Sequence, residues 1–352
     1  MRGGGRWGLV GSGLLLGAVG AALAWLGNPP NTGICVSCFF ENAAGALGLH
    51  ANPRMQYMRP ELLGFFLGSA GAAVAAREFR ARSRGPGVHL LGLGFLMIVG
   101  SAVFIGCPIK AVLRLAGGDL TAVPGLAGLV AGVYAGIRLL EAGEAGLGGR
   151  TRPAPAALAW GAVLAALVLV ALLFVPGALL ASRSGGGALR APVWASLGAG
   201  VLLGTVCQRS RFCITGSVRD AILLRSPWPA LALGAALAGG VAVNAFAGLF
   251  HLGYYDQPGA HLEAGWSLLG MGLVGMAAVV AGGCPFRQII RAGEGDLDAL
   301  TVVAGMVLGG AAVQNWGLGA TAAGVPPAGR VAVLLGLAGL CVLGLASGEG
   351  DP

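Results

Sequence analysis

Long apolar runs separated by short polar segments make up nearly the whole of this 352-residue chain. Roughly 20 apolar residues are needed to span the ~30 Å hydrocarbon core of a membrane. About ten runs meet that requirement, and we predict spans at 9–27, 60–77, 88–106, 121–140, 156–181, 192–206, 228–250, 264–282, 298–316 and 330–347. The pattern therefore predicts an all-α integral membrane protein.

Four other segments are too polar or too short to cross a membrane, and they lie at 33–50, 107–119, 207–225 and 284–296. A helix of about ten residues reaches ~15 Å, which is half of the hydrocarbon core. We therefore predict that the four segments are re-entrant half-helices. Six of the seven cysteines lie in them, namely Cys35, Cys38, Cys107, Cys207, Cys213 and Cys284.

One of these segments occurs twice in the chain. Residues 106–120 and 283–297 share seven identities in fifteen positions. The chemically distinctive pairs are Cys107/Cys284, Arg114/Arg291 and Asp119/Asp296, and the pair Lys110/Arg287 keeps its positive charge. Because a thiol, two cations and an acid recur inside an otherwise apolar chain, we interpret the two segments as one site that is built twice.

The number of predicted spans between the two copies determines their relative orientation. Five crossings separate Cys107 from Cys284, and an odd number inverts the second copy. Paired half-helices that meet near the middle of the membrane are typical of a substrate pathway in an inverted repeat. We predict a first repeat at 1–141, a linker with an extra span at 142–191, a second repeat at 192–316, and a C-terminal span and tail at 317–352.

Composition and charge narrow the class of protein. With 56% hydrophobic and 10% charged residues, the chain is not a soluble globular protein. The net charge of +8 does not indicate a nucleic-acid partner, because the cations lie at the ends of apolar runs. One side of the predicted topology collects fifteen of the Lys and Arg residues and the other side seven. The positive-inside rule then places both chain termini in the cytoplasm.

The Gly-Cys-Pro order at the start of each copy predicts where the thiol lies. Proline suits the first position of a helix, so Cys107 and Cys284 fall at helix N-caps, where free N–H groups attract anions. Positive charge near these thiols comes from Lys110, Arg114, Arg287 and Arg291, and we predict that these residues attract an anion. Asp119 and Asp296 are predicted to cap the next span and to balance the arginines.

The remaining cysteines of the half-helices are less symmetric. Cys38 aligns best with Cys213, which leaves Cys35 and Cys207 as secondary thiols. Cys35 and Cys38 also form a Cys-x-x-Cys sequence, which suits a disulfide, a soft-metal site or two transport thiols. Because no cluster of His or Met lies nearby, we predict no metal and no cofactor. The disulfide and the free thiols stay open as alternatives.

Several motifs together resemble the YeeE/YedE family of sulfur-transport membrane proteins. They are the paired Gly-Cys-Pro motifs, Asn-Pro-Pro-Asn-Thr-Gly-Ile-Cys-Val-Ser-Cys at 28–38, Arg-Leu-Ala-Gly-Gly-Asp-Leu at 114–120 and Cys-Gln-Arg-Ser-Arg-Phe-Cys at 207–213. The chain looks most similar to the YedE branch, which is associated with selenium metabolism. The resemblance implies uptake of a thiosulfate-like anion across a bacterial inner membrane. It also implies a relay through Cys107, Cys284, Cys38 and Cys213, and delivery to a cytoplasmic sulfurtransferase of the TusA type.

We therefore expect a carrier or conduit for a sulfur- or selenium-containing anion, not an enzyme. The anion is expected to enter near Cys38 and Cys107 and to pass to Cys284 and Cys213. Two alternatives stay open. One is a membrane thiol-disulfide oxidoreductase that uses Cys35 and Cys38, and the other is a neutral-solute channel, which the basic, thiol-rich lining disfavours.

Overall fold

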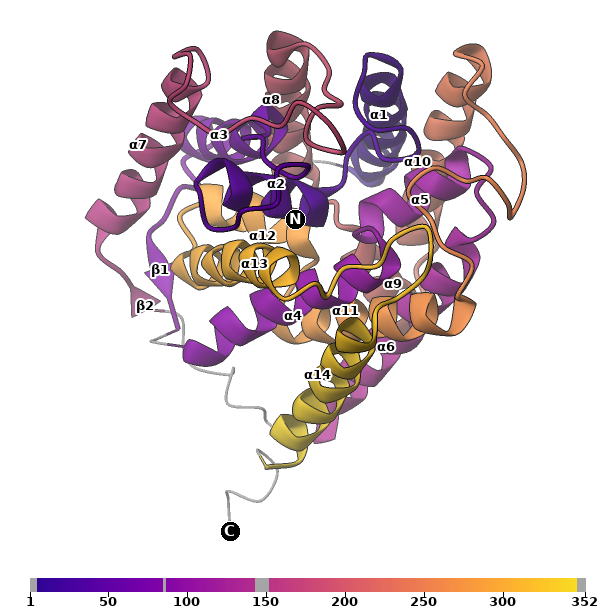
Figure 1. Ribbon diagram of the computed structural model, residues 1–352. Helices are drawn as coiled ribbons and strands as arrows, with labels where there is room; N and C mark the ends of the chain where they lie inside the picture. The colour runs from indigo at the N-terminus through magenta and orange to yellow at the C-terminus, as the bar shows by residue number, and fades with distance from the viewer. Residues whose placement is uncertain (1–4, 85–86, 143–151, 347–352) are drawn as a thin grey trace.

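The computed structural model describes residues 5–84, 87–142 and 152–346, and this part of the chain is almost entirely helical (Figure 1). Its longer helices are α1 (Arg6–Trp25), α3 (Pro60–Ala75), α4 (Val88–Phe104), α6 (Ala122–Ala142), α7 (Ala156–Leu172), α8 (Val193–Ser210), α10 (Pro227–Phe246), α11 (Ala264–Ala281), α13 (Leu297–Asn315) and α14 (Pro327–Ala346). Four short helices lie between them, at α2 (Val36–Ala46), α5 (Pro108–Ala116), α9 (Ile214–Leu224) and α12 (Pro285–Gly293).

Each of the ten predicted spans overlaps one of the longer helices. Within the described residues, six helices are long and apolar enough to cross a membrane, namely those that begin at Arg6, Val88, Ala122, Pro227, Ala264 and Leu297. Shorter apolar helices begin at Pro60, Ala156 and Pro327. The chain is thus a multi-pass, all-helical membrane protein, while the count of ten spans stays a prediction.

The predicted span at 156–181 is too long. Its helix, α7, ends at Leu172, and turns follow around Pro176 and Gly177. A proline disfavours helical geometry in the residue before it, and this accounts for an early end inside an apolar run. Part of the predicted linker, residues 143–151, and the tail after 346 lie outside the described residues.

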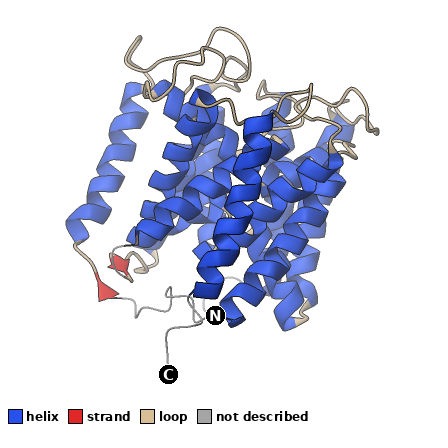
Figure 2. Cartoon of the chain, turned by 60° about the horizontal axis from the view of Figure 1, so that its bottom comes forward, coloured by secondary structure: helices blue, strands red, loops and turns tan. Residues whose placement is uncertain are grey.

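A short two-stranded antiparallel sheet joins two connecting segments of the chain. Its strands are β1 (Arg82–Ser83) and β2 (Arg152–Pro153). Figure 2 shows these strands at one end of the helix bundle, opposite the end where most of the long loops gather. The sheet therefore marks one face of the protein, which the sequence predicts to be cytoplasmic.

The long helices pack in matched pairs. Helix α1 packs against α10 and α3 against α8, while α6 packs against α11 and α4 against α13. In the predicted repeat, the counterparts are α1 and α8, α3 and α10, α4 and α11, and α6 and α13. When each helix is exchanged for its counterpart, the four packed pairs map onto one another. The packing is thus compatible with two related halves that interlock and do not fold side by side.

Small residues allow this interlocking. At Gly17 of α1, an added Cβ atom would lie 1.8 Å from the carbonyl oxygen of Ala236 in α10. Gly68 of α3 faces Val201 of α8 in the same way, with 2.3 Å to its carbonyl oxygen. Glycine therefore lets the backbones approach closely, as is common between helices in membranes.

The short helices lie inside this frame of long helices. Figure 1 shows α2 and α12 in the middle of the bundle, and the two helices contact each other. Helix α2 also packs on α13, α12 on α3, and α5 on α6 and α10. The longer helices thus hold the cysteine-containing segments in the interior, while their re-entrant position in a membrane stays a prediction.

Candidate functional site

The cysteines of the two Gly-Cys-Pro motifs occupy the predicted N-cap positions. Cys107 precedes α5, Cys284 precedes α12, and proline is the first residue of each helix. Both thiols are buried, with 1% exposure each. The free backbone N–H groups of a helix start give each thiol a positive local potential.

A glycine in the left-handed region ends each of these helices. Gly118 and Gly295, which correspond in the repeat, both have φ of 92°. An added Cβ at Gly118 would lie 2.6 Å from the carbonyl oxygen of His251, so the position admits only glycine without strain. Gly293 is the last residue of α12 and packs against Ser69.

Two thiols meet at the start of α12. Cys213 caps α9, and its Sγ accepts a hydrogen bond from the N–H of Gly216 at 3.3 Å. The same Sγ lies 3.4 Å from Sγ of Cys284, although 71 residues separate the two cysteines. Cys207 is buried on the neighbouring helix α8. The structure thus brings the predicted path thiols Cys213 and Cys284 into direct contact.

The first half builds a related arrangement around Cys107. Its Sγ accepts a hydrogen bond from the N–H of Val36, the first residue of α2, at 3.3 Å. Cys35 caps α2 and accepts from the N–H of Cys38. By helix position, therefore, Cys213 corresponds to Cys35, and the sequence alignment with Cys38 was displaced by three residues.

Cys35 and Cys38 are joined by a disulfide. The sequence left open whether these two cysteines form a bridge or stay free thiols, and the structure has the bridge. Cys38 therefore offers no free thiol in this state, and Cys107 is the free thiol beside α2. The first and second halves differ at this point, because the position that corresponds to Cys38 in α9 is Gly216.

Lys110 and Arg287 lie one turn into α5 and α12 and are buried, with 2% and 9% exposure. Lys110 Nζ lies 3.5 Å from the carbonyl oxygen of Gly259. Arg287 donates from Nη2 to the carboxylate of Glu294 at 3.1 Å. Its Nη1 has no hydrogen-bond partner among the described residues. Arg287 therefore retains an unused donor, which is costly in a buried group unless a ligand visits.

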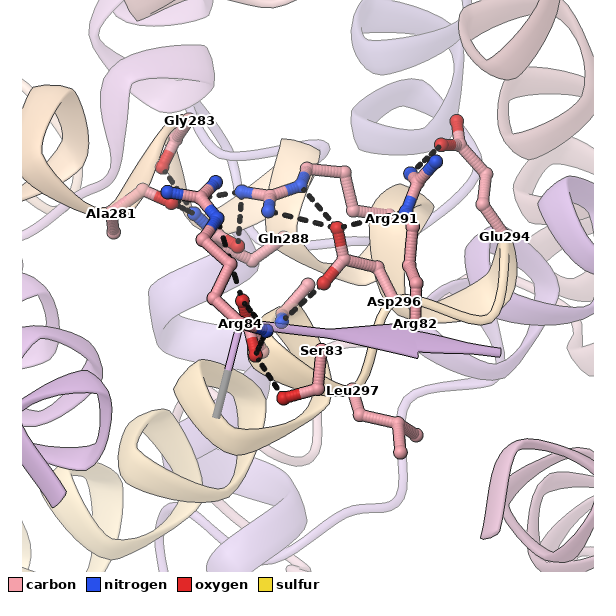
Figure 3. A network of polar contacts seen from close by, with 12 residues as sticks. Arg82, Ser83, Arg84, Ala281, Gly283, Gln288, Arg291, Glu294, Asp296 and Leu297 are labelled. Carbon is pink, nitrogen blue, oxygen red and sulfur yellow. Dashed lines mark hydrogen bonds and ion pairs between the residues drawn. The ribbon is translucent and has the colours of Figure 1, made fainter. Parts of the chain in front are cut away.

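Arg114 and Arg291 are tied to the acids that follow them in each copy. Arg114 donates from Nε to Asp119 at 2.7 Å, and Nη1 donates to the carbonyl oxygen of Phe104 at 3.0 Å. In the second copy, Arg291 Nη2 donates to Asp296 at 2.9 Å, and Nη1 donates to the carbonyl oxygen of Ala281 at 2.8 Å. Figure 3 shows Arg291 reaching Asp296 and Gln288.

The predicted charge balance at Asp119 and Asp296 is thus present in both copies. Asp296 also caps α13 through the N–H of Ala299, as predicted.

A pocket of about 250 Å³ opens beside the Cys213–Cys284 pair. Its lining includes Cys213, Arg287 and Arg211, and also Thr215, whose buried hydroxyl has no hydrogen-bond partner among the described residues. The pocket therefore combines a helix N-terminus, arginine side chains and two unused donors. All of these groups stabilise negative charge.

A larger pocket of about 910 Å³ adjoins the first one and shares Gly282 and Arg219 with it. Its basic residues are Arg80, Arg82, Arg84, Arg152, Arg219 and Arg291. Arg82 is within 3.5 Å of Glu294 and of Asp296, and Figure 3 shows this network beside β1. The pocket thus forms a basic mouth on the side that carries the sheet.

Glu294 is a central residue of the site that the sequence interpretation missed. It is 2% exposed and accepts from Arg82, Arg211 and Arg287. In the aligned repeat, its position is Gly117 in the first copy. The signal that could have identified Glu294 is that the second copy has an acid where the first copy has a glycine.

In the described part of the chain, no group of three or more His, Cys, Asp or Glu side chains could hold a metal ion. The polar groups of the site are instead thiols, the hydroxyl of Thr215, guanidinium groups, a lysine and backbone N–H groups, and its carboxylate, Glu294, is surrounded by three arginines. Such a set suits a small anion.

Comparison with known proteins shows a similarity in the second half of the chain. No curated protein matches the chain. A family model described as sulphur transport matches residues 209–344, which is less than half of the chain and contains Cys213, Arg287 and Cys284. The protein is therefore a multi-pass helical membrane protein whose second half is similar to sulphur-transport proteins.

Proposed function

We propose that this protein conducts a sulfur- or selenium-containing oxyanion, such as thiosulfate, across the bacterial inner membrane. The observation that carries the proposal is the contact between Cys213 and Cys284 beside the unused donors of Arg287 and Thr215. The contact lies in the region that is similar to sulphur-transport proteins. An oxyanion accepts hydrogen bonds from such donors, and its sulfur or selenium atom can contact the thiols.

The path that we propose has two binding stations. On the outer side, the anion meets Cys107, Lys110 and the start of α5. On the inner side, it meets Cys284, Cys213, Arg287 and the starts of α12 and α9. The two stations belong to an inverted repeat, an assignment supported by the matched helix pairs and the equivalent Arg-Asp contacts.

Weak contacts at these stations favour conduction. A neutral S–H group is a weak hydrogen-bond donor, so a thiol holds an anion only loosely. A conduction site must release what it binds, and two weak stations achieve this better than one tight site. We assign attraction of the anion mainly to Lys110 and Arg287, because Arg114 and Arg291 already donate to Asp119 and Asp296.

The basic pocket near β1 supports a cytoplasmic exit. The positive-inside rule places this face in the cytoplasm, together with both chain termini. An anion that leaves Cys284 then enters a mouth lined by arginines. A TusA-like sulfurtransferase that accepts sulfur at this mouth is part of the proposal.

Uptake of labelled anions into proteoliposomes tests the proposal. Wild-type protein is expected to take up thiosulfate or selenite faster than sulfate, and Cys284→Ala and Cys107→Ala are each expected to lose most of the uptake. Cys341→Ala is the matched control, because this free cysteine is exposed on α14, away from the stations. Undiminished uptake in both Cys107→Ala and Cys284→Ala would refute the thiol relay.

Mass spectrometry of the recovered protein separates passage from sulfur transfer. In transfer, a cysteine thiolate forms a bond to the outer sulfur of thiosulfate, the S–S bond of thiosulfate breaks, and sulfite leaves with the electron pair. The cysteine then carries one extra sulfur as a persulfide. Passage without transfer leaves every thiol unmodified.

A second candidate function is supported by the disulfide between Cys35 and Cys38. A bridge at the N-terminus of α2, next to the free thiol of Cys107, is also what a membrane thiol-disulfide oxidoreductase requires. Replacing Cys35 with serine distinguishes the two. A conduit retains anion uptake in this variant, whereas an oxidoreductase loses its activity.

A further inference from the structure

Glu41 is a buried carboxyl group that the proposed path does not use. It lies on α2 with 6% exposure, and its Oε2 accepts a hydrogen bond from Nε2 of Gln314 on α13. A carboxylate inside a membrane protein is costly unless it is paired, and such groups commonly mark ion or proton pathways. One amide donor does not balance a full negative charge.

Glu41 shares helix α2 with Val36, whose N–H donates to Sγ of Cys107, and Lys110, the cation of the proposed outer station, follows Cys107 by three residues. Lys110 is itself almost fully buried, and its ammonium has only a long contact of 3.5 Å with the carbonyl of Gly259. In the proposed path, Lys110 thus lies near both the fixed carboxylate of Glu41 and the arriving anion. A charged Glu41 weakens the attraction of Lys110 for that anion.

A chain of hydrogen bonds connects Glu41 to the surface. Gln314 accepts at Oε1 from Nδ2 of Asn52 at 2.6 Å, and Asn52 in turn accepts from the exposed N–H of Arg54. His50 lies beside this chain, with Nε2 at 2.9 Å from the carbonyl oxygen of Glu41. Residues 51–54 belong to the loop between α2 and α3, which the predicted topology places outside.

We propose that Glu41 is a proton-binding site that links anion binding at Lys110 to the uptake of one proton from the outer side. The step converts the Glu41 carboxylate and one proton from external water into a carboxylic acid, and no other bond changes. The Lys110 ammonium then faces the anion without a competing charge. The inference rests on the proposed function and adds a coupling ion to it.

Other ionisable groups near α2 are already paired or lie at a distance. Asp298 is at the opposite end of α13 from Gln314, about 24 Å away at 1.5 Å per residue. The remaining groups on or near the packed helices are His89 at the start of α4, Arg287 and Arg291 on α12, and Arg59 over the ring of Phe39. Arg287 and Arg291 each pair with an acid of their own.

Calorimetric binding of thiosulfate to the purified full chain tests the proposal from about pH 5.5 to about pH 8.5. Linkage of one proton makes the dissociation constant rise by up to about tenfold per pH unit above the titration of the site. In Glu41→Gln, we expect a constant affinity close to the low-pH value of the wild type. Glu263→Gln is the matched control, because this carboxyl pairs with Arg330 in an outer loop and is expected to keep the wild-type slope.

A second measurement does not depend on any variant. Titrations in buffers of different ionisation enthalpy count the protons taken up per anion, and we expect a value near zero below the titration of the site that approaches one above it. A wild-type affinity that does not change with pH, or a Glu41→Gln protein that keeps the slope, overturns the inference and leaves the proposed function standing. Failure of the wild type to bind thiosulfate, selenite or sulfate at any pH refutes the proposed function, and the inference with it.

Discussion

Removing the carboxylate of Asp119 is expected to destabilise the protein strongly. Arg114 is 1% exposed and Asp119 is fully buried, and the two form an ion pair with 2.7 Å between Nε and Oδ2. Asp119→Ala leaves the guanidinium with the carbonyl of Phe104 and the hydroxyl of Thr121 but without a counter-charge. Breaking a buried pair from one side costs about 3–5 kcal/mol, because the remaining charge stays uncompensated.

Thermal unfolding of the detergent-solubilised protein measures this effect. A loss of about 3–5 kcal/mol corresponds to a fall of roughly 6–10 °C in Tm for a large domain. The control is Glu141→Gln, which breaks the exposed pair with Arg138 and is expected to cost about 0–1 kcal/mol. The pairs differ chiefly in burial, because the side chains of the control pair are 66% and 51% exposed.

The double variant Arg114→Met with Asp119→Ala completes the test. Replacing both charges with apolar groups removes the uncompensated cation, so most of the lost stability is expected to return. A Tm for Asp119→Ala that matches that of Glu141→Gln would refute the reasoning. So would a double variant that is less stable than the single one, because the pair would then contribute through something other than charge compensation.

Two further predictions concern the ends of the short helices. Arg287→Met is expected to weaken thiosulfate binding about 10- to 100-fold, because a hydrogen bond to a charged group contributes about 1.5–3 kcal/mol. An unchanged dissociation constant in calorimetry would exclude Arg287 as a ligand. Gly118→Ala is expected to lower the free energy of unfolding by about 1–3 kcal/mol, because Gly118 has a positive φ and lies against the backbone of His251. The control is Gly234→Ala on α10, where nothing lies near an added Cβ, and it is expected to leave Tm unchanged or raise it.

The helix positions could be predicted from the sequence because they depend on local properties. The length of an apolar run determines whether a helix can cross a membrane, and a proline after a cysteine places that cysteine at a helix start. The second rule holds for Cys107 and Cys284, which both cap a helix that begins with proline. The length of the apolar run gave too long a helix at 156–181, because α7 ends at Leu172, shortly before Pro176.

The contacts of the site were mostly beyond prediction from the sequence. The repeat indicated that Arg114 and Asp119 belong together, because five residues separate them in both copies. It did not show Cys35 as the cap of α2 or the bridge from Cys35 to Cys38. A shift of three residues along a helix changes which side chain caps it, and an alignment of short, divergent segments does not resolve such a shift.

The sequence by itself determined a helical membrane protein with a thiol and a cation placed at the start of two similar short helices. Only the tertiary structure decided which groups meet there, as in the 3.4 Å contact between Cys213 and Cys284 and the three arginines around Glu294. The physical reason is that the length of apolar runs specifies where helices form. It does not specify the packing register that sets their neighbours, and in this chain glycine-mediated contacts between distant helices set that register.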